Sequence, residues 1–278
     1  MLKYIVYTGV AALIVWAAAY LIYRFHQSLK GKRGCGCGGC PLLPPQDIEA
    51  DAHIGPQQGG ALMDHQLKQL QDWISESRHI VFFGGAGVST ESGIPDFRSV
   101  DGLYHQQYAF PPETILSHSF FERNPEEFYR FYRSKMLFPQ ARPNAAHWKL
   151  AELEAAGKLT AVVTQNIDGL HQAAGSKTVY ELHGSVHRNH CMKCRRFYGL
   201  DFLLETGGVP CCPACGGVVK PDVVLYEECL DETTMEGAVE AIAGADMLII
   251  GGTSLAVYPA AGLIRYYRGN RLALINKS

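Results

Sequence analysis

The chain has 278 residues, of which 47% are hydrophobic and 19% are charged, so it is long enough for one medium-sized folded domain plus an extension. Its net charge of −2 argues against nucleic-acid binding through bulk electrostatics, and we expect no nucleic-acid partner. The nine cysteines cluster in tight pairs, which indicates metal binding in a reducing compartment rather than a secreted disulfide scaffold.

The first predicted element is an uncharged apolar segment, residues 4–23. Twenty helical residues span about 30 Å, which is enough to cross the hydrocarbon core of a bilayer. Tyrosine and tryptophan rings lie near both ends, as in membrane-interface belts. Basic residues follow the segment, at Arg24, Lys30, Lys32 and Arg33, whereas only Lys3 precedes it. The sequence therefore predicts a single-pass membrane anchor with a basic flank, residues 1–30, and places the downstream chain on the cytoplasmic side.

Two alternatives exist for this segment. A cleaved signal peptide, with small residues at Ala17–Ala19, is disfavoured because signal peptides carry their positive charge before the apolar run. A buried core helix is disfavoured because the run is apolar all round and lies at the extreme terminus.

Residues 31–60 are predicted to be a linker. The basic, glycine-rich strip Gly31–Cys40 carries Cys35, Cys37 and Cys40. These thiols are consistent with a soft-metal or redox site, with S-palmitoylation, or with an inert spacer, and three of them leave a tetrahedral metal site one ligand short. Residues 41–60 are rich in Pro, Gly and Gln and indicate an extended, disordered segment. Residues 1 to about 45 resemble a small cysteine-rich membrane protein found beside bacterial ferrous-iron transporters.

From Ala61 the hydrophobic pattern becomes helical. Leu67, Leu70 and Ile74 recur on one face with Trp73 beside them, so we expect this helix to pack on a sheet.

A buried strand is predicted next, over the β-branched and aromatic run 79–83. It ends at glycines, and Gly85, Ala86 and Gly87 form a turn without large side chains. Backbone N–H groups in such a turn can approach a pyrophosphate, with the N-terminus of the next helix behind them. A glycine turn alone is weak evidence, because most such turns bind nothing.

The second half of this stretch is more informative. Ser92–Arg98 places a rigid Pro95, the carboxylate of Asp96, the ring of Phe97 and the guanidinium of Arg98 beside the glycine turn. These groups suit a nucleotide that carries a sugar and a cationic ring. Residues 99–112 are polar and aromatic without periodicity, which favours a mobile loop over the cofactor rather than an ordinary surface loop.

Two helices follow, one beginning at the N-cap Asn124 with Pro125 at its first position, the other spanning residues 144–158. Residues 158–164 are predicted to be a strand. Gln165, Asn166 and Asp168 follow it, at the end where open α/β sheets bind ligands.

A further strand is predicted over residues 177–182, and His183 follows it. A lone histidine after a strand is usually structural, but histidine titrates near neutral pH and suits a general base. We assign secondary importance to His171 and His187.

A paired-cysteine pattern comes next. Cys191 and Cys194 are separated by seventeen residues from Cys212 and Cys215, which is the spacing of a zinc ribbon. Four thiolates complete a tetrahedral site, so the predicted zinc is structural. Cys211 is a rival to Cys212, which we prefer because it opens the usual knuckle turn, and we expect Cys229 to be buried or idle.

The last predicted strands lead to small polar residues. The apolar strand 246–251 ends at Gly251, followed by Thr253 and Ser254, which fit phosphate and ribose contacts. The final strand, 271–275, precedes Asn276, which we expect to reach the adenosine.

Four stretches together resemble the sirtuins, the NAD-dependent protein deacylases. They are the 84–98 stretch, Thr164–His171, Glu181–Gly184 and the paired-cysteine module, in the sirtuin order. The resemblance covers residues 61–278 and implies a Rossmann-like parallel sheet with a smaller zinc-ribbon and helical domain, the zinc module lying at about 185–220. It implies that NAD binds at these turns and strand ends, that Asn166 and Asp168 hold the nicotinamide amide, and that His183 is the general base.

The resemblance also implies the reaction and its substrate. The acyl oxygen of an acetylated lysine in a protein attacks the ribose carbon as nicotinamide leaves, Phe97 shields that carbon from water, and the acyl group passes to the sugar. Residues 220–228 resemble the strip that holds the substrate peptide as an added strand, with Val223, Val224 and Tyr226 as substrate contacts. The family usually has Gly where this chain has Glu227.

Two features refine the expectation. In sirtuins a Tyr and an Arg three residues apart mark enzymes for negatively charged acyl groups, whereas here Tyr129 is followed by Tyr132, with Arg133 one position off, which favours acetyl and other uncharged groups. Sirtuins normally continue beyond the last strand seen here, so we expect a shortened C-terminus. Two alternatives stay open: a protein ADP-ribosyltransferase, and an inactive sirtuin domain on a membrane metal or redox module.

Overall fold

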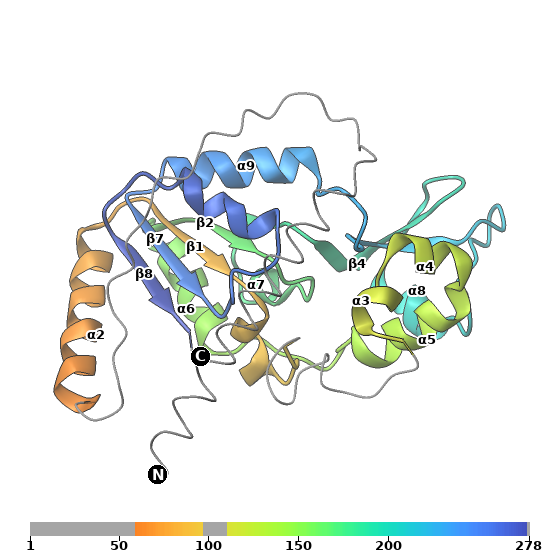
Figure 1. Cartoon of the computed structure of the whole chain (residues 1–278), viewed down its shortest axis with the longest axis horizontal. Coiled ribbons are helices and arrows are strands. Elements are labelled where there is room, and N and C mark those ends of the chain that lie inside the picture. The colour runs from red at the N-terminus through yellow and green to blue at the C-terminus, as the bar shows by residue number, and fades with distance from the viewer. Residues whose placement is uncertain (1–58, 97–109, 277–278) are drawn as a thin grey trace, which may run out of the picture. The chain divides into compact units, whose positions relative to one another are not determined.

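The computed structural model describes residues 59–96 and 110–276 (Figure 1). Contacts divide the chain into residues 1–55 and 56–278, and everything described belongs to the second unit. The predicted anchor, the cysteine strip, most of the linker, Phe97, Arg98 and most of the loop after them lie outside the described residues. Within the described part, no helix is long and apolar enough to cross a membrane.

A five-stranded parallel sheet forms the larger domain, as predicted. In spatial order its strands are β3 (Val179–Glu181), β2 (Leu159–Thr164), β1 (Ile80–Gly84), β7 (Met247–Gly251) and β8 (Leu272–Ile275). Every residue of β1 is buried, because it pairs with β2 on one side and β7 on the other. That explains its continuous hydrophobic run, which is typical of a strand covered on both faces.

Helices cover both faces of the sheet (Figure 1). Alternate residues of β1 point to opposite faces, so Phe82 contacts one layer and Phe83 the other. The Phe82 layer comes from α2 (Gly59–Glu76) and α6 (Ala145–Ala155), and the Phe83 layer from α9 (Glu232–Ala243) and the 3₁₀ helix η4 (Ala260–Tyr266).

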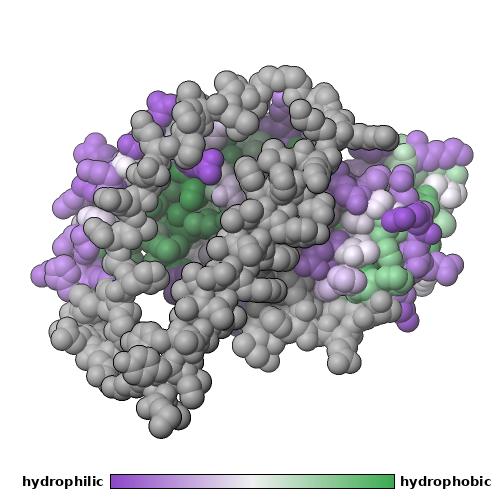
Figure 2. All heavy atoms as spheres, in the orientation of Figure 1, coloured by the Kyte–Doolittle hydropathy of each residue, from purple (hydrophilic) through white to green (hydrophobic). Residues whose placement is uncertain are grey.

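The first helix packs on the sheet with a different set of residues from the predicted one. Leu70, Trp73 and Ile74 contact the Phe82 layer, whereas Leu67 is 57% exposed. The expectation for Leu67 was therefore wrong: it lies about one turn before Leu70, the first residue of α2 in the packed layer. The edge strand β8, whose Ala273 packs in the same layer as Leu70 and Trp73 of α2, also carries exposed apolar residues, and Figure 2 shows hydrophobic surface on the sheet domain.

The smaller domain combines a three-stranded antiparallel sheet with short helices. The strands, in spatial order, are β5 (Phe197–Tyr198), β4 (Gly184–Cys191) and β6 (Val219–Val223), and the helices are α3 (Pro112–Ile115), α4 (His118–Arg123), α5 (Pro125–Lys135) and α8 (Leu200–Glu205). Phe128, Tyr129 and Tyr132 of α5 are fully buried in its core. Asn124 caps α5 as predicted, since its side chain accepts a hydrogen bond from the Glu127 amide.

Candidate cofactor and catalytic site

The order of the strands creates a crevice at the carboxyl ends of β1 and β7. From β1 the chain moves outward through β2 to β3, and it then crosses to the opposite side of β1 to form β7 and β8. When the connections of two neighbouring strands run in opposite directions, a gap opens above the carboxyl ends of these strands. Open α/β sheets bind their ligands in this gap. The turn after each of these two strands is rich in glycine.

The two glycine turns lie against each other without room for side chains. A Cβ at Gly87 would lie 2.9 Å from the Gly252 Cα, and a Cβ at Gly85 would lie 2.8 Å from the Thr253 Cβ. Gly252 has a φ of +59°, which favours glycine, and its added Cβ would meet the backbone of Val88. The glycines predicted to approach a pyrophosphate are therefore also required for packing of the two turns.

The amides of the first turn hold the two turns together. The N–H groups of Gly85 and Gly87 donate to the carbonyls of Gly251 and Gly252, over 3.2 and 2.8 Å. The segment that follows forms two short 3₁₀ turns, η1 (Ala86–Val88) and η2 (Thr90–Ser92). The expectation of a helix directly behind the glycine turn was wrong, because the serine and glycine residues after Val88 break the chain into single turns.

Asn166 and Asp168 are linked through Ser89. The Ser89 hydroxyl donates to the Asp168 carboxylate over 2.6 Å and accepts from the Asn166 side-chain amide over 3.0 Å. Asn166 and Ser89 are buried. Ser89 was not predicted from the sequence, since only the pairing of β1 with β2 brings it next to residues almost eighty positions away.

Thr253 joins the ends of three strands. Its hydroxyl accepts from the Gln165 side chain over 3.0 Å, and its carbonyl accepts from the Asn276 side chain over 3.3 Å. The structure thus brings these three predicted residues together at one end of the sheet. Asp96 is the last described residue before residues 97–109, which the structure does not describe. Ser254, which follows Thr253, is exposed.

His183 follows β3 and reaches the same end of the sheet. Its Nδ1 lies 3.0 Å from the Gln165 carbonyl. A carbonyl only accepts hydrogen bonds, so Nδ1 carries the hydrogen and Nε2 of the neutral ring is the basic nitrogen. Burial lowers the pKa of His183, and the hydrogen bond to the Gln165 carbonyl offsets part of that shift. The ring is therefore neutral at pH 7 and able to accept a proton.

The three predicted substrate residues lie along and beyond β6. Val223 is buried in the core of the smaller domain, Val224 is half-buried with its amide donating to the His183 carbonyl over 3.0 Å, and Tyr226 is exposed. The backbone of Tyr226 pairs with the corner between α3 and α4, donating to the Leu116 carbonyl.

Glu227 occupies a backbone conformation that favours glycine. Its φ is +78°, which costs about 1 kcal/mol for a residue with a side chain. Its carboxylate accepts hydrogen bonds from the amide and hydroxyl of Ser119, over 2.9 and 3.1 Å, and so fastens the strip to α4. The departure from the usual glycine thus keeps the turn and adds a contact.

The four predicted cysteines converge at one point. The Sγ atoms of Cys191, Cys194, Cys212 and Cys215 all lie within 4.8 Å of one another. The Tyr198 hydroxyl lies 2.9 Å from the Cys212 Sγ and lowers the pKa of that thiol to about 6. Four sulfur atoms at this spacing fit one tetrahedral Zn²⁺ with no open position.

The other described cysteines lie outside this set. Cys211 is exposed, with its thiol directed at the Val209 carbonyl, which agrees with the preference for Cys212. Cys229 is exposed, so of the two alternatives expected for it, buried or idle, the buried one is excluded.

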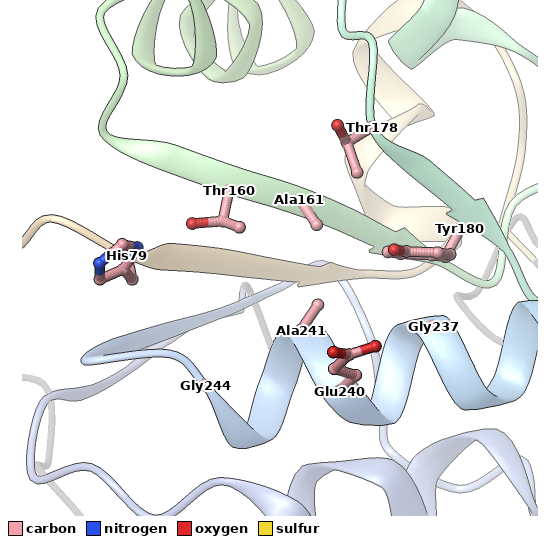
Figure 3. A pocket seen from close by; sticks show the side chains of 9 residues that line it. All are labelled: His79, Thr160, Ala161, Thr178, Tyr180, Gly237, Glu240, Ala241 and Gly244. Atoms are coloured by element: carbon pink, nitrogen blue, oxygen red, sulfur yellow. The ribbon is translucent and has the colours of Figure 1, made fainter.

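A cavity of about 370 Å³ lies elsewhere, between α9 and the sheet (Figure 3). Its walls include Thr160 and Ala161 of β2, Tyr180 of β3, and Gly237 and Glu240 of α9. Its lining includes His79, which precedes β1, and none of the residues of the two glycine turns, so it is separate from the crevice at the carboxyl ends.

A parallel sheet with polar side chains gathered at its switch point, joined to a four-cysteine ribbon, defines a nucleotide-binding α/β protein with a zinc-ribbon subdomain. Residues 85–259 match the model of the Sir2 family, and the chain belongs to that family.

Curated relatives and solved structures agree with this assignment. The chain is 63% identical over 219 residues to the NAD-dependent protein deacetylase of Clostridium perfringens, which covers 78% of this chain and 90% of the relative. It is 43% identical to the NAD-dependent protein deacetylase of Staphylococcus aureus, covering 77% and 89%. A structure of Sir2 with p53 peptide and NAD⁺ matches with a TM-score of 0.66 at 42% identity, over 76% of this chain and 86% of that chain. A structure of Sir2 with a deacetylated p53 peptide and 3′-O-acetyl ADP-ribose has a TM-score of 0.70 at 41% identity, over 76% and 87%.

The N-terminal part matches a different family. Residues 8–42 match the model of the FeoB-associated Cys-rich membrane protein. These residues lie outside the part of the chain that the structure describes.

Proposed function

We propose that this chain is an NAD-dependent protein deacetylase that converts acetyl-lysine to lysine. One observation carries this conclusion: a neutral, half-buried His183 stands beside Gln165, which itself contacts Thr253, at the switch point of a Sir2-type sheet. Relatives of up to 63% identity carry the name NAD-dependent protein deacetylase, and they are covered almost completely by this chain.

The chain's own residues suit the chemistry of NAD. When bound, NAD supplies a ribose carbon that an acyl oxygen can attack as nicotinamide leaves. Asn166 and Asp168, held by Ser89, offer an amide and a carboxylate to the nicotinamide amide. His183 offers the lone pair of Nε2 to the proton of a ribose hydroxyl, because its Nδ1–H is already committed to the Gln165 carbonyl.

The substrate is an acetylated lysine within a protein. A structure of Sir2 with acetylated peptide matches this chain at 40% identity with a TM-score of 0.67. We place the peptide along residues 223–226, next to His183. The preference for uncharged acyl groups is supported by Arg133, whose guanidinium donates to the carbonyls of Leu203 and Gly208 and so is held by the smaller domain.

The zinc ion has a structural role in this proposal. The four cysteines fix β4, β5 and the segment before β6 to one another, and β4 begins directly after His183. An ion with four thiolate ligands has no position for substrate, so it supports the fold of the ribbon rather than the reaction.

The test is turnover by the full chain in detergent, with NAD and an acetyl-lysine peptide. We expect nicotinamide release that depends on the peptide, with loss of the acetyl group seen by mass spectrometry. His183→Ala should lower the rate by at least about 100-fold, as expected for loss of a general base, whereas the matched variant His190→Ala, on β4 away from the crevice, should retain it.

Two outcomes contradict the proposal. Folded, zinc-loaded protein without peptide-dependent release refutes the deacetylase. Gain of an ADP-ribose mass on the protein substrate, without loss of the acetyl group, identifies a transferase instead.

We further propose that residues 4–23 anchor the enzyme in a membrane, with the catalytic domain on the cytoplasmic side. The support is the uncharged length of this segment, the basic residues that follow it, and the match of residues 8–42 to a membrane-protein family. Cys35, Cys37 and Cys40 then lie just inside the membrane surface.

A further inference from the structure

The strand β4 passes beside the turn that carries Asn166 and Asp168. It starts directly after His183 and ends at the zinc ligand Cys191. Between these points, two successive residues contact the turn: the Val186 amide donates to the Ile167 carbonyl over 3.0 Å, and the His187 ring reaches the carbonyl of Asp168. The ribbon and the crevice are thus connected at this place.

The His187 contact is a directed hydrogen bond. The Nε2 atom lies 3.1 Å from the Asp168 carbonyl oxygen. The carbonyl can only accept, so Nε2 carries a hydrogen and donates it. Both the neutral tautomer with hydrogen on Nε2 and the doubly protonated ring can make this bond.

The ring also fits against the backbone of the turn. Gly169 has a φ of +72°, and a Cβ at that position would lie 2.7 Å from the Cδ2 of His187. The imidazole therefore lies directly on Gly169, in space that a larger residue would fill. Asp168 is consequently held at its carboxylate, by the Ser89 hydroxyl and the Leu170 amide, and at its backbone carbonyl, by His187.

We propose that His187 is a positioning residue for the cofactor pocket: it fixes the turn from Asn166 to Gly169 and thereby raises the affinity for NAD and for free nicotinamide. The inference rests on the proposed function of Asn166 and Asp168. His187 acts only through the turn, so its effect falls on the nicotinamide side and spares the peptide strip beyond β6.

The experiment compares His187→Phe, which keeps a ring on Gly169 but has no donor, with His187→Gln, whose side-chain N–H can reach the same carbonyl. His190→Phe is the matched control, since His190 lies on the same strand and packs edge-on against Phe197, 5.6 Å away. Loss of one hydrogen bond should raise the KM for NAD and the inhibition constant of nicotinamide together, about fivefold each. The KM for the acetyl-peptide should change less than twofold, and the Gln variant should recover most of the loss.

Amide hydrogen exchange provides a readout that needs no turnover. We expect faster exchange of residues 166–169 in His187→Phe but not in the Gln or His190→Phe proteins. An unchanged KM for NAD in His187→Phe, a Gln variant as impaired as Phe, or unchanged exchange overturns the inference. A wild-type chain without turnover refutes the proposed function separately, while the exchange measurement still decides whether His187 holds the turn.

Discussion

At the scale of single residues, the base that we propose, His183, can accept a proton only while its imidazole is neutral. Burial lowers its pKa, with partial compensation from the Gln165 carbonyl. As the pH falls, the ring therefore gains its proton later than an exposed histidine, whose pKa is about 6.5. We expect kcat/KM to be constant down to about pH 6.5. Below that pH it should decline as a single group, His183, becomes protonated.

The measurement is the pH profile of kcat/KM for acetyl-peptide at saturating NAD. Circular dichroism at each pH separates loss of activity from loss of fold. An acid limb centred at or above the ordinary histidine value would contradict the lowered pKa.

A second histidine couples stability to pH. His171 is buried against His147, 4.7 Å between ring centroids, and neither of its ring nitrogens has a hydrogen-bond partner among the described residues. Burial, with a smaller contribution from His147, lowers the pKa of His171 to about 3. The unfolded chain, with a pKa of about 6.5, binds the proton first, so stability is present above that pH and is lost as pH falls toward 3.

We expect His171 to account for a loss of about 2 kcal/mol in the free energy of unfolding between pH 7 and 5, because the unfolded chain binds one more proton than the folded chain in this range. His171→Phe, which cannot be protonated, should show a correspondingly smaller loss. Urea unfolding at the two pH values measures it, and an equal acid sensitivity in both proteins would refute the assignment.

The roles of single residues could be predicted from the sequence only where they depend on neighbouring residues in the chain. Asn124 capping α5 follows from neighbouring residues alone, so the sequence predicted it. Ser89 and His187 act through groups brought close by β-sheet pairing and by the course of β4, and no local pattern marks them. The roles of His183 and Asn166 in the reaction came from the family resemblance. Their positions after strands were expected from the hydrophobic runs that precede them, and β3 and β2 do end just before them.

At the scale of elements, Arg188 ties together three strands. Its guanidinium contacts Glu181 at the end of β3, over 2.6 Å, and Asp222 of β6, over 2.8 Å. The Glu181 side chain is only 6% exposed, so removing Arg188 leaves a buried carboxylate without its cation. We expect Arg188→Ala to lower the free energy of unfolding by about 2 kcal/mol, less than for a fully buried pair because the arginine is half-exposed.

Arg130→Ala is the matched control. Arg130 pairs with Glu127 on the surface of α5, with its own side chain 74% exposed, so its loss should cost about 0.5 kcal/mol or less. Urea unfolding compares the two variants. Equal losses in the free energy of unfolding would show that the contacts of Arg188 stabilise the fold no more than an exposed ion pair does.

The zinc ribbon gives a sharper comparison. Cys211 and Cys212 are neighbours in sequence, yet only Cys212 lies in the four-sulfur cluster. We expect Cys212→Ser to reduce bound zinc well below one ion per chain and to lower the melting temperature, because ligand loss removes binding energy that stabilises the ribbon. Cys211→Ser should keep both.

Elemental analysis together with thermal unfolding decides the matter. Zinc loss in Cys211→Ser, or full zinc in Cys212→Ser, would reverse the choice between the two cysteines.

Strands were easier to predict than the turns at their ends. Residues 80–83 are hydrophobic throughout because β1 is central, and that property is visible in the sequence. The helix expected after the glycine turn is a pair of 3₁₀ turns, because the serine and glycine residues after Val88 break the chain into single turns. Likewise, periodicity placed Leu67 on the packed face, but tertiary contacts decide which turns of α2 are covered, and these begin at Leu70.

At the scale of the whole molecule, two family matches follow one another along the sequence. The Sir2 match spans residues 85–259 and the membrane-protein match residues 8–42, and the described fold belongs to the unit 56–278. The described groups that form the crevice all belong to the second unit. The membrane anchor that we propose concerns where the reaction takes place rather than its chemistry.

The anchor predicts a specific partition. We expect the full chain, expressed in bacteria, to sediment with membranes, to resist extraction by high salt and alkaline carbonate, and to be released by detergent, because an apolar segment of about twenty residues is held by hydrocarbon rather than by charge. Val15→Arg together with Leu13→Arg should move the protein to the soluble fraction, since each charge near the bilayer centre costs about 2.5–3.5 kcal/mol. The control replaces Val15 and Leu13 by Ala, which keeps the segment apolar. Salt-extractable wild-type protein would show that the basic flank alone binds the surface, and soluble wild-type protein would refute the anchor while leaving the deacetylase unaffected.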